Sequence, residues 1–132
     1  MPEPAKTTKI LIIDDEESFG RMVKWNLEMA GPYEVRVENQ GARALGAAQA
    51  FKPDLIFLDL LMPDLNGSEV ARQIRADATH KNTPIIFLTA TVSSEEVAAG
   101  RRLIEGQPFL AKPVSVMDLI GCIQKSLGRS RR

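Results

Sequence analysis

Five polar side chains of this sequence each follow a short apolar run, where they could act together: Asp14, Asp15, Asp59, Thr89 and Lys112. Three carboxylates within a few ångströms of one another repel, and one takes up a proton unless a cation lies between them. Mg²⁺ removes this conflict because it binds one or two carboxylates together with waters and substrate phosphate. A carboxylate beside the ion can attack phosphorus, while an ammonium and a hydroxyl stabilise the phosphoryl oxygens. The set therefore predicts phosphoryl transfer onto an aspartate.

Each of these residues also has an ordinary structural explanation. The acids of segment 14–18 are typical of a helix start, where they cap backbone amides and interact favourably with the helix dipole. Asp59 stands before the turn-forming segment 62–67, although an unpaired carboxylate at the end of a buried strand is costly. Thr89 alone is typical of a helix cap, and Lys112 alone of a surface lysine. The conjunction of compatible side chains after four apolar runs is what indicates a site.

The apolar runs themselves predict strands. Three of them contain no polar residue, which is typical of strands buried on both faces of a parallel sheet: Ile10–Ile13, Leu55–Leu58 and Ile85–Leu88. The segment Tyr33–Glu38 alternates between apolar and charged residues, as an edge strand with one wet face does. Phe109–Ala111 is short and follows a proline, which also favours an edge. The sequence therefore predicts three central strands and two edge strands.

Helical patterns separate these strands. The segment 94–104 has a poor apolar stripe and a glycine at position 100, so we expect its helix to be the least stable of five. The other four are expected to bury Phe19, Met22, Val23, Leu27 and Ala30 before Gly31; Ala44, Ala47, Ala48 and Phe51 before Pro53; Val70, Ala71 and Ile74 after a start near Ser68; and Val116, Leu119, Ile120, Ile123 and Leu127 after the capping box Ser115–Asp118.

Strict alternation of five strands and five helices predicts an α/β fold, a three-layer sandwich with a parallel sheet and helices on both faces. With the alternating second strand at one edge and the fifth strand at the other, the simplest strand order is 2-1-3-4-5. Ligands of such sheets bind at the carboxyl ends of the strands, beside the point where the winding reverses. That point lies between the first and third strands, so Asp14, Asp15 and Asp59 are expected to meet there.

The composition limits the possible functions. A chain of 132 residues with 44% apolar and 26% charged residues is expected to form one compact domain, 9–128, with a flexible leader 1–8 and a basic tail 129–132. Lys and Arg total 17, as do Asp and Glu, so the basic excess of a nucleic-acid-binding domain is missing. The apolar runs are far shorter than the ~20 residues of a membrane helix. The single cysteine, Cys122, excludes an intramolecular disulfide and favours a reducing compartment, which leads us to expect a cytoplasmic protein.

Four stretches of the chain resemble the receiver domain of bacterial two-component response regulators: ILIIDDEES, PDLIFLDLLMPDLNGSEV, PIIFLTAT and FLAKPVS. The resemblance extends from about Lys9 to Leu127. It implies a flavodoxin-like fold and a phosphorylation-controlled signalling switch, which is not an enzyme beyond its own phosphoryl transfer and slow dephosphorylation. The implied partners are a histidine kinase or phosphotransfer protein and a downstream protein target or output domain, with neither nucleic acid nor membrane bound by this domain.

The resemblance also implies a role for each acid. Asp59 would accept the phosphoryl group from a phosphohistidine of the partner. Asp15 and Asp59 would bind Mg²⁺ directly, together with the backbone carbonyl of Leu61. Asp14 would act on the ion mainly through a metal-bound water.

The same resemblance implies how phosphorylation would change the domain. Lys112 would pair with the phosphoryl group, and Thr89 would move to donate a hydrogen bond to it. Phe109 would turn inward in response, and Pro113 would follow a cis peptide bond. The change is expected on the fourth helix, fifth strand and fifth helix, a face that could also form a homodimer.

Two features depart from the usual pattern of this family. The segment before the fifth strand, 104–108, lacks the usual small Gly-Ala turn, so the start of that strand is open. The aromatic switch position is Phe109 in place of tyrosine, so a hydroxyl contact to a partner is missing. Leu61 is apolar and could restrict attacking water, from which we predict slow self-dephosphorylation.

Three other functions share part of this pattern. A flavin-binding redox domain shares the expected fold, but the acids of 14–17 would repel the flavin phosphate. A metal-dependent phosphatase with an aspartyl nucleophile usually carries a second acid two residues later, where this chain has Leu61. A degenerate receiver that only docks partners is less consistent with the complete set of acceptor residues.

Overall fold

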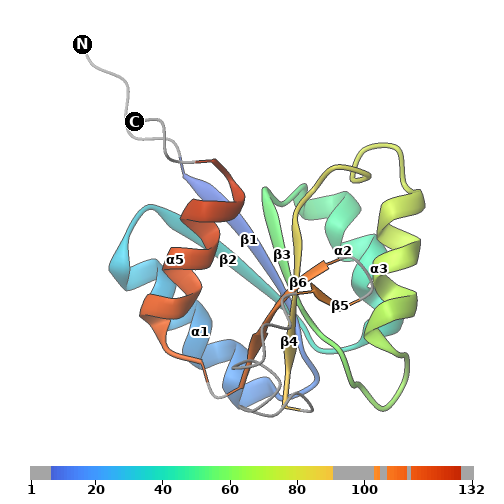
Figure 1. Cartoon of the computed structure of the whole chain (residues 1–132), viewed down its shortest axis with the longest axis horizontal. Coiled ribbons are helices and arrows are strands. Elements are labelled where there is room, and N and C mark those ends of the chain that lie inside the picture. Colours follow the sequence, from blue (N-terminus) through green and yellow to red (C-terminus); the bar gives the residue numbers. More distant parts are fainter. Residues whose placement is uncertain (1–6, 91–102, 105–106, 113, 129–132) are drawn as a thin grey trace.

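A central sheet lies between two layers of helices (Figure 1). The computed structural model describes residues 7–90, 103–104, 107–112 and 114–128. One face of the sheet carries α1 (Glu17–Ala30) and α5 (Val116–Ser126), and the other carries α2 (Ala44–Phe51) and α3 (Gly67–Ala76), with the short 3-10 helix η1 (Gly41–Arg43) before α2. The strands are β1 (Thr8–Ile13), β2 (Tyr33–Glu38), β3 (Leu55–Asp59), β4 (Ile85–Thr89), β5 (Leu103–Ile104) and β6 (Gln107–Ala111). The predicted three-layer α/β fold is confirmed.

Five parallel strands lie in the order β2-β1-β3-β4-β6. Since β6 is the fifth parallel strand along the chain, this is the predicted order 2-1-3-4-5. In β1, Ile10 pairs with Val35 of β2 on one side and with Leu55 of β3 on the other. The carboxyl ends of β1 and β3 are therefore neighbours, and a residue that follows either strand lies at the same edge of the sheet.

The sheet ends differently from the prediction beyond β6. Leu103 and Ile104, expected at the end of the fourth helix, form the strand β5, which pairs antiparallel with β6. The fifth parallel strand is therefore not the outermost one, and it begins at Gln107, two residues earlier than predicted. The β-branched residue Ile104 favours a strand, and the weak apolar stripe of the preceding segment does not favour a helix. The remainder of the expected fourth helix, 94–102, lies outside the described residues, as does Pro113.

The core consists of one apolar cluster on each face of the sheet. The side chains of β1 alternate between them, with Leu11 and Ile13 toward α2 and α3, and Ile10 and Ile12 toward α1 and α5. All four are fully buried. Complete burial of such a side chain contributes about 1.5–3 kcal/mol. The uninterrupted apolar runs therefore exist because helices cover both faces.

Helix α1 corrects part of the predicted apolar stripe. Its buried residues are Gly20, Val23 and Leu27, whereas Met22 is 47% exposed. Ala30, also expected to be buried, is exposed. The helix is rotated because Gly20 faces the sheet, where an added Cβ would lie 2.5 Å from Cγ1 of Val37. A glycine gives no apolar signal in the sequence, so this close approach could not be read from the stripe.

The other described helices agree with their predicted faces and starts. All four residues expected to be buried in α2 are buried, as are the three in α3. The side chain of Asn66 caps α3 by accepting a hydrogen bond from the Ser68 amide at 2.7 Å. The predicted capping box of Ser115 and Asp118 begins α5, which buries Leu119 and Ile123. Three further residues expected to be buried are only partly buried against the same cluster: Val116, Ile120 and Leu127. None of the helices within the described residues is both long and apolar enough to span a membrane.

Gly67, the first residue of α3, lies directly against the end of β3. A Cβ at this position would be 2.5 Å from the backbone oxygen of Asp59 and 2.7 Å from Cα of Leu60. The Gly67 amide donates a hydrogen bond to the Leu60 carbonyl at 2.8 Å. Only a residue without a side chain allows α3 to begin this close to Asp59.

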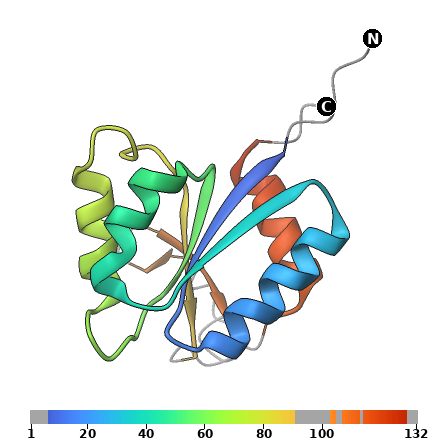
Figure 2. The same cartoon turned by 180° about the vertical axis from the view of Figure 1, so that it is seen from behind.

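Helix α1 also covers the outer margin of β2, as the blue helix beside the cyan strand shows in Figure 2. The amide of Val35 donates to Oε2 of Glu28 at 2.9 Å, and the Val35 carbonyl accepts from Nζ of Lys24 at 2.7 Å. Lys24 and Glu28 also pair with each other at 2.9 Å. The hydrogen bond from Val35, followed by the contact with Lys24, lowers the pKa of Glu28. Two side chains thus satisfy backbone groups that an edge strand would otherwise expose.

Candidate functional site

The structure brings Asp14, Asp15 and Asp59 together at the carboxyl ends of β1 and β3. One carboxylate oxygen from each lies within 4.8 Å of the others. Asp14 is fully buried, Asp59 is 7% exposed and Asp15 is half-buried. Such a cluster of acids inside a protein is unfavourable unless a positive charge lies beside it.

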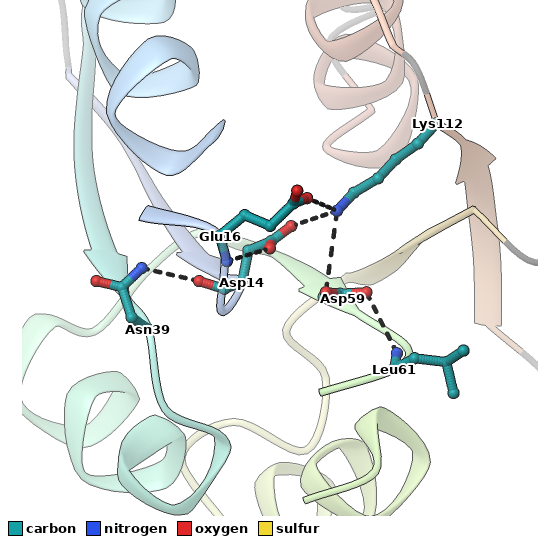
Figure 3. Close-up of polar contacts among 6 residues, drawn as sticks. All are labelled: Asp14, Glu16, Asn39, Asp59, Leu61 and Lys112. Carbon is teal, nitrogen blue, oxygen red and sulfur yellow. Dashed lines mark hydrogen bonds and ion pairs between the residues drawn. The ribbon is translucent and has the colours of Figure 1, made fainter. Parts of the chain in front are cut away.

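The backbone and side chain of Asp14 are fixed from several sides (Figure 3). Its amide donates to the Glu38 carbonyl at 3.0 Å, and its own carbonyl accepts from Nδ2 of Asn39 at 2.8 Å. Its Oδ1 accepts from the Glu16 amide at 2.9 Å. The turn from β1 into α1 therefore holds Asp14 in one orientation, with Oδ2 directed at Lys112.

Asp59 is the last residue of β3 and combines burial with an acidic neighbourhood. Its Oδ1 accepts a hydrogen bond from the Leu61 amide at 3.2 Å. Burial, followed by the negative charge of Asp14, raises the pKa of Asp59 to about 7, although Lys112 acts in the opposite direction. The negative charge of Asp59 is therefore unfavourable in this site, and a bound cation would stabilise it.

Lys112 brings an ammonium into the acid cluster. Its Nζ lies 2.8 Å from Oδ2 of Asp14, 3.1 Å from Oε1 of Glu16 and 3.9 Å from Oδ2 of Asp59. Burial disfavours the charged lysine, but hydrogen bonds and ion pairs with Asp14, Glu16 and Asp59 outweigh it and raise the pKa of Lys112. The backbone amide of Lys112 donates to the Thr89 carbonyl at 2.8 Å, which ties the end of β6 to the end of β4.

The three remaining predicted residues, Thr89, Leu61 and Phe109, lie around this cluster or in the adjoining strands. Thr89 ends β4 and is buried, one residue beyond Leu88, which pairs with Asp59. Leu61 is 55% exposed beside Asp59. Phe109 lies opposite Phe87 and is half-buried against the core cluster of the α2 and α3 face.

An open pocket of about 300 Å³ lies over the cluster, with walls from Asp15, Glu16, Asp59, Leu61, Ala90 and Lys112. Oxygen ligands of Mg²⁺ lie about 2.0–2.1 Å from the ion, so two opposite ligands are about 4.2 Å apart. The observed spread of up to 4.8 Å fits this arrangement if one acid acts through a water. The donor set is all oxygen, which suits a hard cation, so the residues present fit Mg²⁺.

Three residues of the site were missed by the sequence analysis: Glu16, Asn39 and Phe19. Glu16 was interpreted as a helix-dipole acid, yet it contacts Lys112 at 3.1 Å. Asn39 follows the carboxyl end of β2, so the rule that identified the other strand-end residues could have found it. Phe19 was assigned to the apolar stripe, but its ring centroid lies 4.5 Å from Nζ of Lys112.

Comparison with known proteins gives the same family from sequence and from structure. Residues 10–124 match the family model described as the response regulator receiver domain. The response regulator ArlR of Staphylococcus saprophyticus is 37% identical over 122 residues, which cover 92% of this chain and 53% of ArlR. The chain spans about half the length of the curated relatives that it matches.

Two solved structures have the same fold. The chemotaxis protein CheY4 of Vibrio cholerae superimposes with a TM-score of 0.79 at 34% identity, covering 92% of this chain and 100% of CheY4. The receiver domain of the sensor histidine kinase PA1611 from Pseudomonas aeruginosa has a TM-score of 0.77 at 28% identity, covers 93% and 99% of the two chains, and holds a magnesium ion in its active site cleft. This chain belongs to the response regulator receiver domains of two-component signalling.

Proposed function

We propose that Asp59 accepts a phosphoryl group from a phosphohistidine of a histidine kinase or phosphotransfer protein, in a reaction that requires Mg²⁺. The observation that carries this proposal is that the carboxylates of Asp15 and Asp59 and the Lys112 ammonium line one open pocket, with the buried carboxylate of Asp14 beside them. A purely structural cluster would have its charges balanced and its space filled. Here the acids outnumber the ammonium, and the pocket has room for the ligand that would balance them.

In the transfer step, a bond forms between an Asp59 carboxylate oxygen and phosphorus while the P–N bond of the phosphohistidine breaks. The electron pair of that bond stays on the imidazole, which leaves as neutral histidine because its other ring nitrogen carries a proton. The Leu61 amide holds Oδ1 of Asp59, so we assign Oδ2, which faces Lys112 at 3.9 Å, as the attacking atom. This orientation brings the nucleophile toward the pocket before the donor arrives.

The charge of the transferred group would be balanced by Mg²⁺, held by residues of this site, together with Lys112. Asp15, Asp59 and the backbone carbonyl of Leu61 would hold Mg²⁺ directly, and Asp14 would act through a water. When bound, the ion would neutralise the acids and polarise the phosphoryl oxygens. Lys112 would then donate its N–H groups to the phosphoryl oxygens, as charge-assisted hydrogen bonds.

The phosphoryl group adds about −1.5 to −2 charges and three strong acceptors at Asp59. Thr89, at the end of the neighbouring strand, would turn its hydroxyl toward the group, and Phe109 would move further into the core. The change would be read on the face that the sequence predicts for the segment 94–102 together with β6 and α5. A downstream protein, an output domain or a second copy of this chain would recognise that face, and the domain would catalyse only its own phosphoryl transfer and slow dephosphorylation.

The test is incubation of the protein with acetyl phosphate and Mg²⁺, followed by intact-mass measurement. We expect the mass of one phosphoryl group to be gained by the wild type and not by Asp59→Asn, and the gain to vanish when a chelator removes the metal. Incorporation that persists in Asp59→Asn would contradict the assignment of the acceptor.

A further inference from the structure

We infer that Phe19 is a positioning residue, whose aromatic ring holds the Lys112 ammonium over the pocket and so prepares it for the phosphoryl group. This inference rests on the proposed function. Phe19 lies in the first turn of α1, and Nζ of Lys112 is 4.5 Å from the centre of its ring. Cation–π attraction operates within about 6 Å of a ring face.

The ammonium of Lys112 also contacts three carboxylates, of which Asp14 and Glu16 draw it away from the acceptor Asp59. The Nζ atom is closest to Asp14 and Glu16, at 2.8 and 3.1 Å, and lies 3.9 Å from Asp59. When Asp59 carries a phosphoryl group, the ammonium must give up some of these contacts. A lysine side chain is a flexible stem with a point charge, so ion pairs alone do not fix where the ammonium goes.

An aromatic ring acts differently from a fourth acid. It attracts the cation through its quadrupole, adds no formal negative charge to a site that already has an excess, and accepts no N–H that the phosphoryl group needs. The contact with Phe19 can therefore persist while the N–H donors change partners. The Lys112 side chain is only 14% exposed, so the attraction acts in a partly desolvated place where it is stronger.

The alternative is that Phe19 only fills space. It is partly buried and packs against the core cluster of the α1 and α5 face. A packing role requires volume, which leucine supplies, whereas a positioning role requires the ring, which tyrosine retains. The chain also offers a matched control, because Nζ of Lys9 lies 5.2 Å from the ring centre of Phe51, a contact of the same kind that involves none of the site residues.

The experiment compares wild type with Phe19→Leu, Phe19→Tyr and the control Phe51→Leu. The first measurement is the ¹H–¹³C NMR spectrum of the Lys112 ε-methylene, assigned by its loss in Lys112→Met. The second is the dissociation constant of fluoroberyllate, a tetrahedral mimic of a phosphoryl group, in the presence of Mg²⁺. The third is the dissociation constant of Mg²⁺ alone.

We expect the ring current of Phe19 to shift the Lys112 ε-methylene upfield in the wild type, and Phe19→Leu to abolish that shift. Phe19→Leu is expected to raise the dissociation constant of fluoroberyllate about threefold to tenfold. Phe19→Tyr should retain both properties, Phe51→Leu should change neither, and Mg²⁺ binding should be the same in all variants.

The inference is overturned if Phe19→Leu binds fluoroberyllate as the wild type does, if Phe19→Tyr is as weak as Phe19→Leu, or if the upfield shift is missing in the wild type. Failure of the proposed function looks different, because then the wild type itself would neither bind fluoroberyllate nor gain a phosphoryl group. That result would overturn both. Thermal unfolding of each variant verifies that it is folded under the conditions used.

Discussion

The polar side chains at the two ends of the sheet have opposite surroundings. At the end where β1, β3 and β4 begin, the exposed Asp54, the half-buried Arg75 and the buried His80 each have a hydrogen-bond partner. Oδ2 of Asp54 accepts from the Lys9 amide at 2.8 Å, and Arg75 donates to the backbone carbonyls of His80 and Thr83. His80 is 2% exposed, and its Nδ1 lies 3.0 Å from Oδ2 of Asp77.

At the end where the same strands finish, the acids are not balanced. Asp14, Glu16 and Asp59 surround the Lys112 ammonium, and Asp15 adds a further carboxylate within 4.8 Å of Asp14 and Asp59. The pKa of Asp59 is raised to about 7, chiefly by burial and then by Asp14. One end of the sheet therefore stabilises the fold, while the excess of acids at the other end carries an electrostatic cost that a bound cation would relieve. The difference separates a structural polar cluster from a functional one on physical grounds.

The largest effect is expected from Gly67→Ala, which disturbs the unbalanced end alone. The new Cβ would lie 2.5 Å from the Asp59 backbone oxygen, so either α3 or the end of β3 must move. We expect a loss of about 2–4 kcal/mol in the free energy of unfolding, measured with urea. Gly46→Ala is the matched control, since a Cβ there meets nothing within 4 Å. Equal stability of the two variants would mean that α3 does not begin tightly against Asp59.

Asp59→Asn is expected to stabilise the metal-free protein, by roughly 1–3 kcal/mol at pH 8. The pKa of Asp59 in the folded protein, about 7, is above its unfolded value of about 3.9, so the folded state binds more protons between these values. Stability of the wild type should therefore fall as pH rises from about 4 through 7, and the variant should lack this fall. Urea unfolding in a chelator at pH 5 and pH 8 measures the difference, and a gain of the same size at both pH values would contradict it.

At the balanced end, His80→Ala is expected to destabilise the protein by about 1–3 kcal/mol, because it removes a buried side chain and the partner of Asp77. Phosphoryl incorporation by the folded variant should equal that of the wild type. Opposite signs for His80→Ala and Asp59→Asn in the same urea experiment are the sharpest form of the comparison. A rise in the stability of His80→Ala would contradict the difference between the two ends of the sheet.

Glu28→Gln tests a third polar cluster, which lies at the edge of the sheet and is balanced like the first. We expect a loss of about 0.5–1 kcal/mol at pH 7, reduced by the partial exposure of the Lys24–Glu28 pair. The pKa of Glu28 is lowered in the folded state, so its contribution is present above the unfolded value of about 4.3 and is lost as pH falls through the folded value. The two proteins should therefore differ at pH 7 and converge near pH 3, as measured by urea unfolding.

Leu61→Asn leaves stability nearly unchanged and tests the lifetime of the phosphoryl group. Leu61 is 55% exposed at the pocket, where an apolar side chain can hinder the approach of water to phosphorus. We expect the phosphorylated wild type to lose its group slowly and the variant to lose it several times faster, followed by intact mass over time. The same decay rate in both proteins would contradict a role for Leu61.

The sequence was sufficient for the features that follow from strand periodicity. Uninterrupted apolar runs located β1, β3 and β4, and their shared direction brought Asp14, Asp59 and Thr89 to one edge. Features that depend on how elements approach one another could not be read in the same way. Gly20 of α1 lies against Val37, a close approach that no apolar pattern indicates. Leu103 and Ile104 pair with β6 as a strand, and no alternating pattern in the sequence indicates that pairing.

The partners of Lys112 illustrate the same limit within the site. Its position after the fifth parallel strand indicated that it would reach the acids. Its contacts with Glu16 and Phe19 depend on the path from β1 into α1, where the Glu16 amide turns back to Asp14 at 2.9 Å. Sequence spacing gives the residue type at each strand end, but the orientation of a flexible side chain is set by contacts from other elements.

The pair Lys24 and Glu28 has a consequence beyond stability. By occupying the amide and the carbonyl of Val35, these side chains leave the central part of β2 without a template to which another strand could add. Any polypeptide that extended the sheet on this side, in an aggregate or in a complex, would first have to displace both charges from the backbone. Helix α1 therefore hinders the addition of another strand to the edge of the sheet formed by β2.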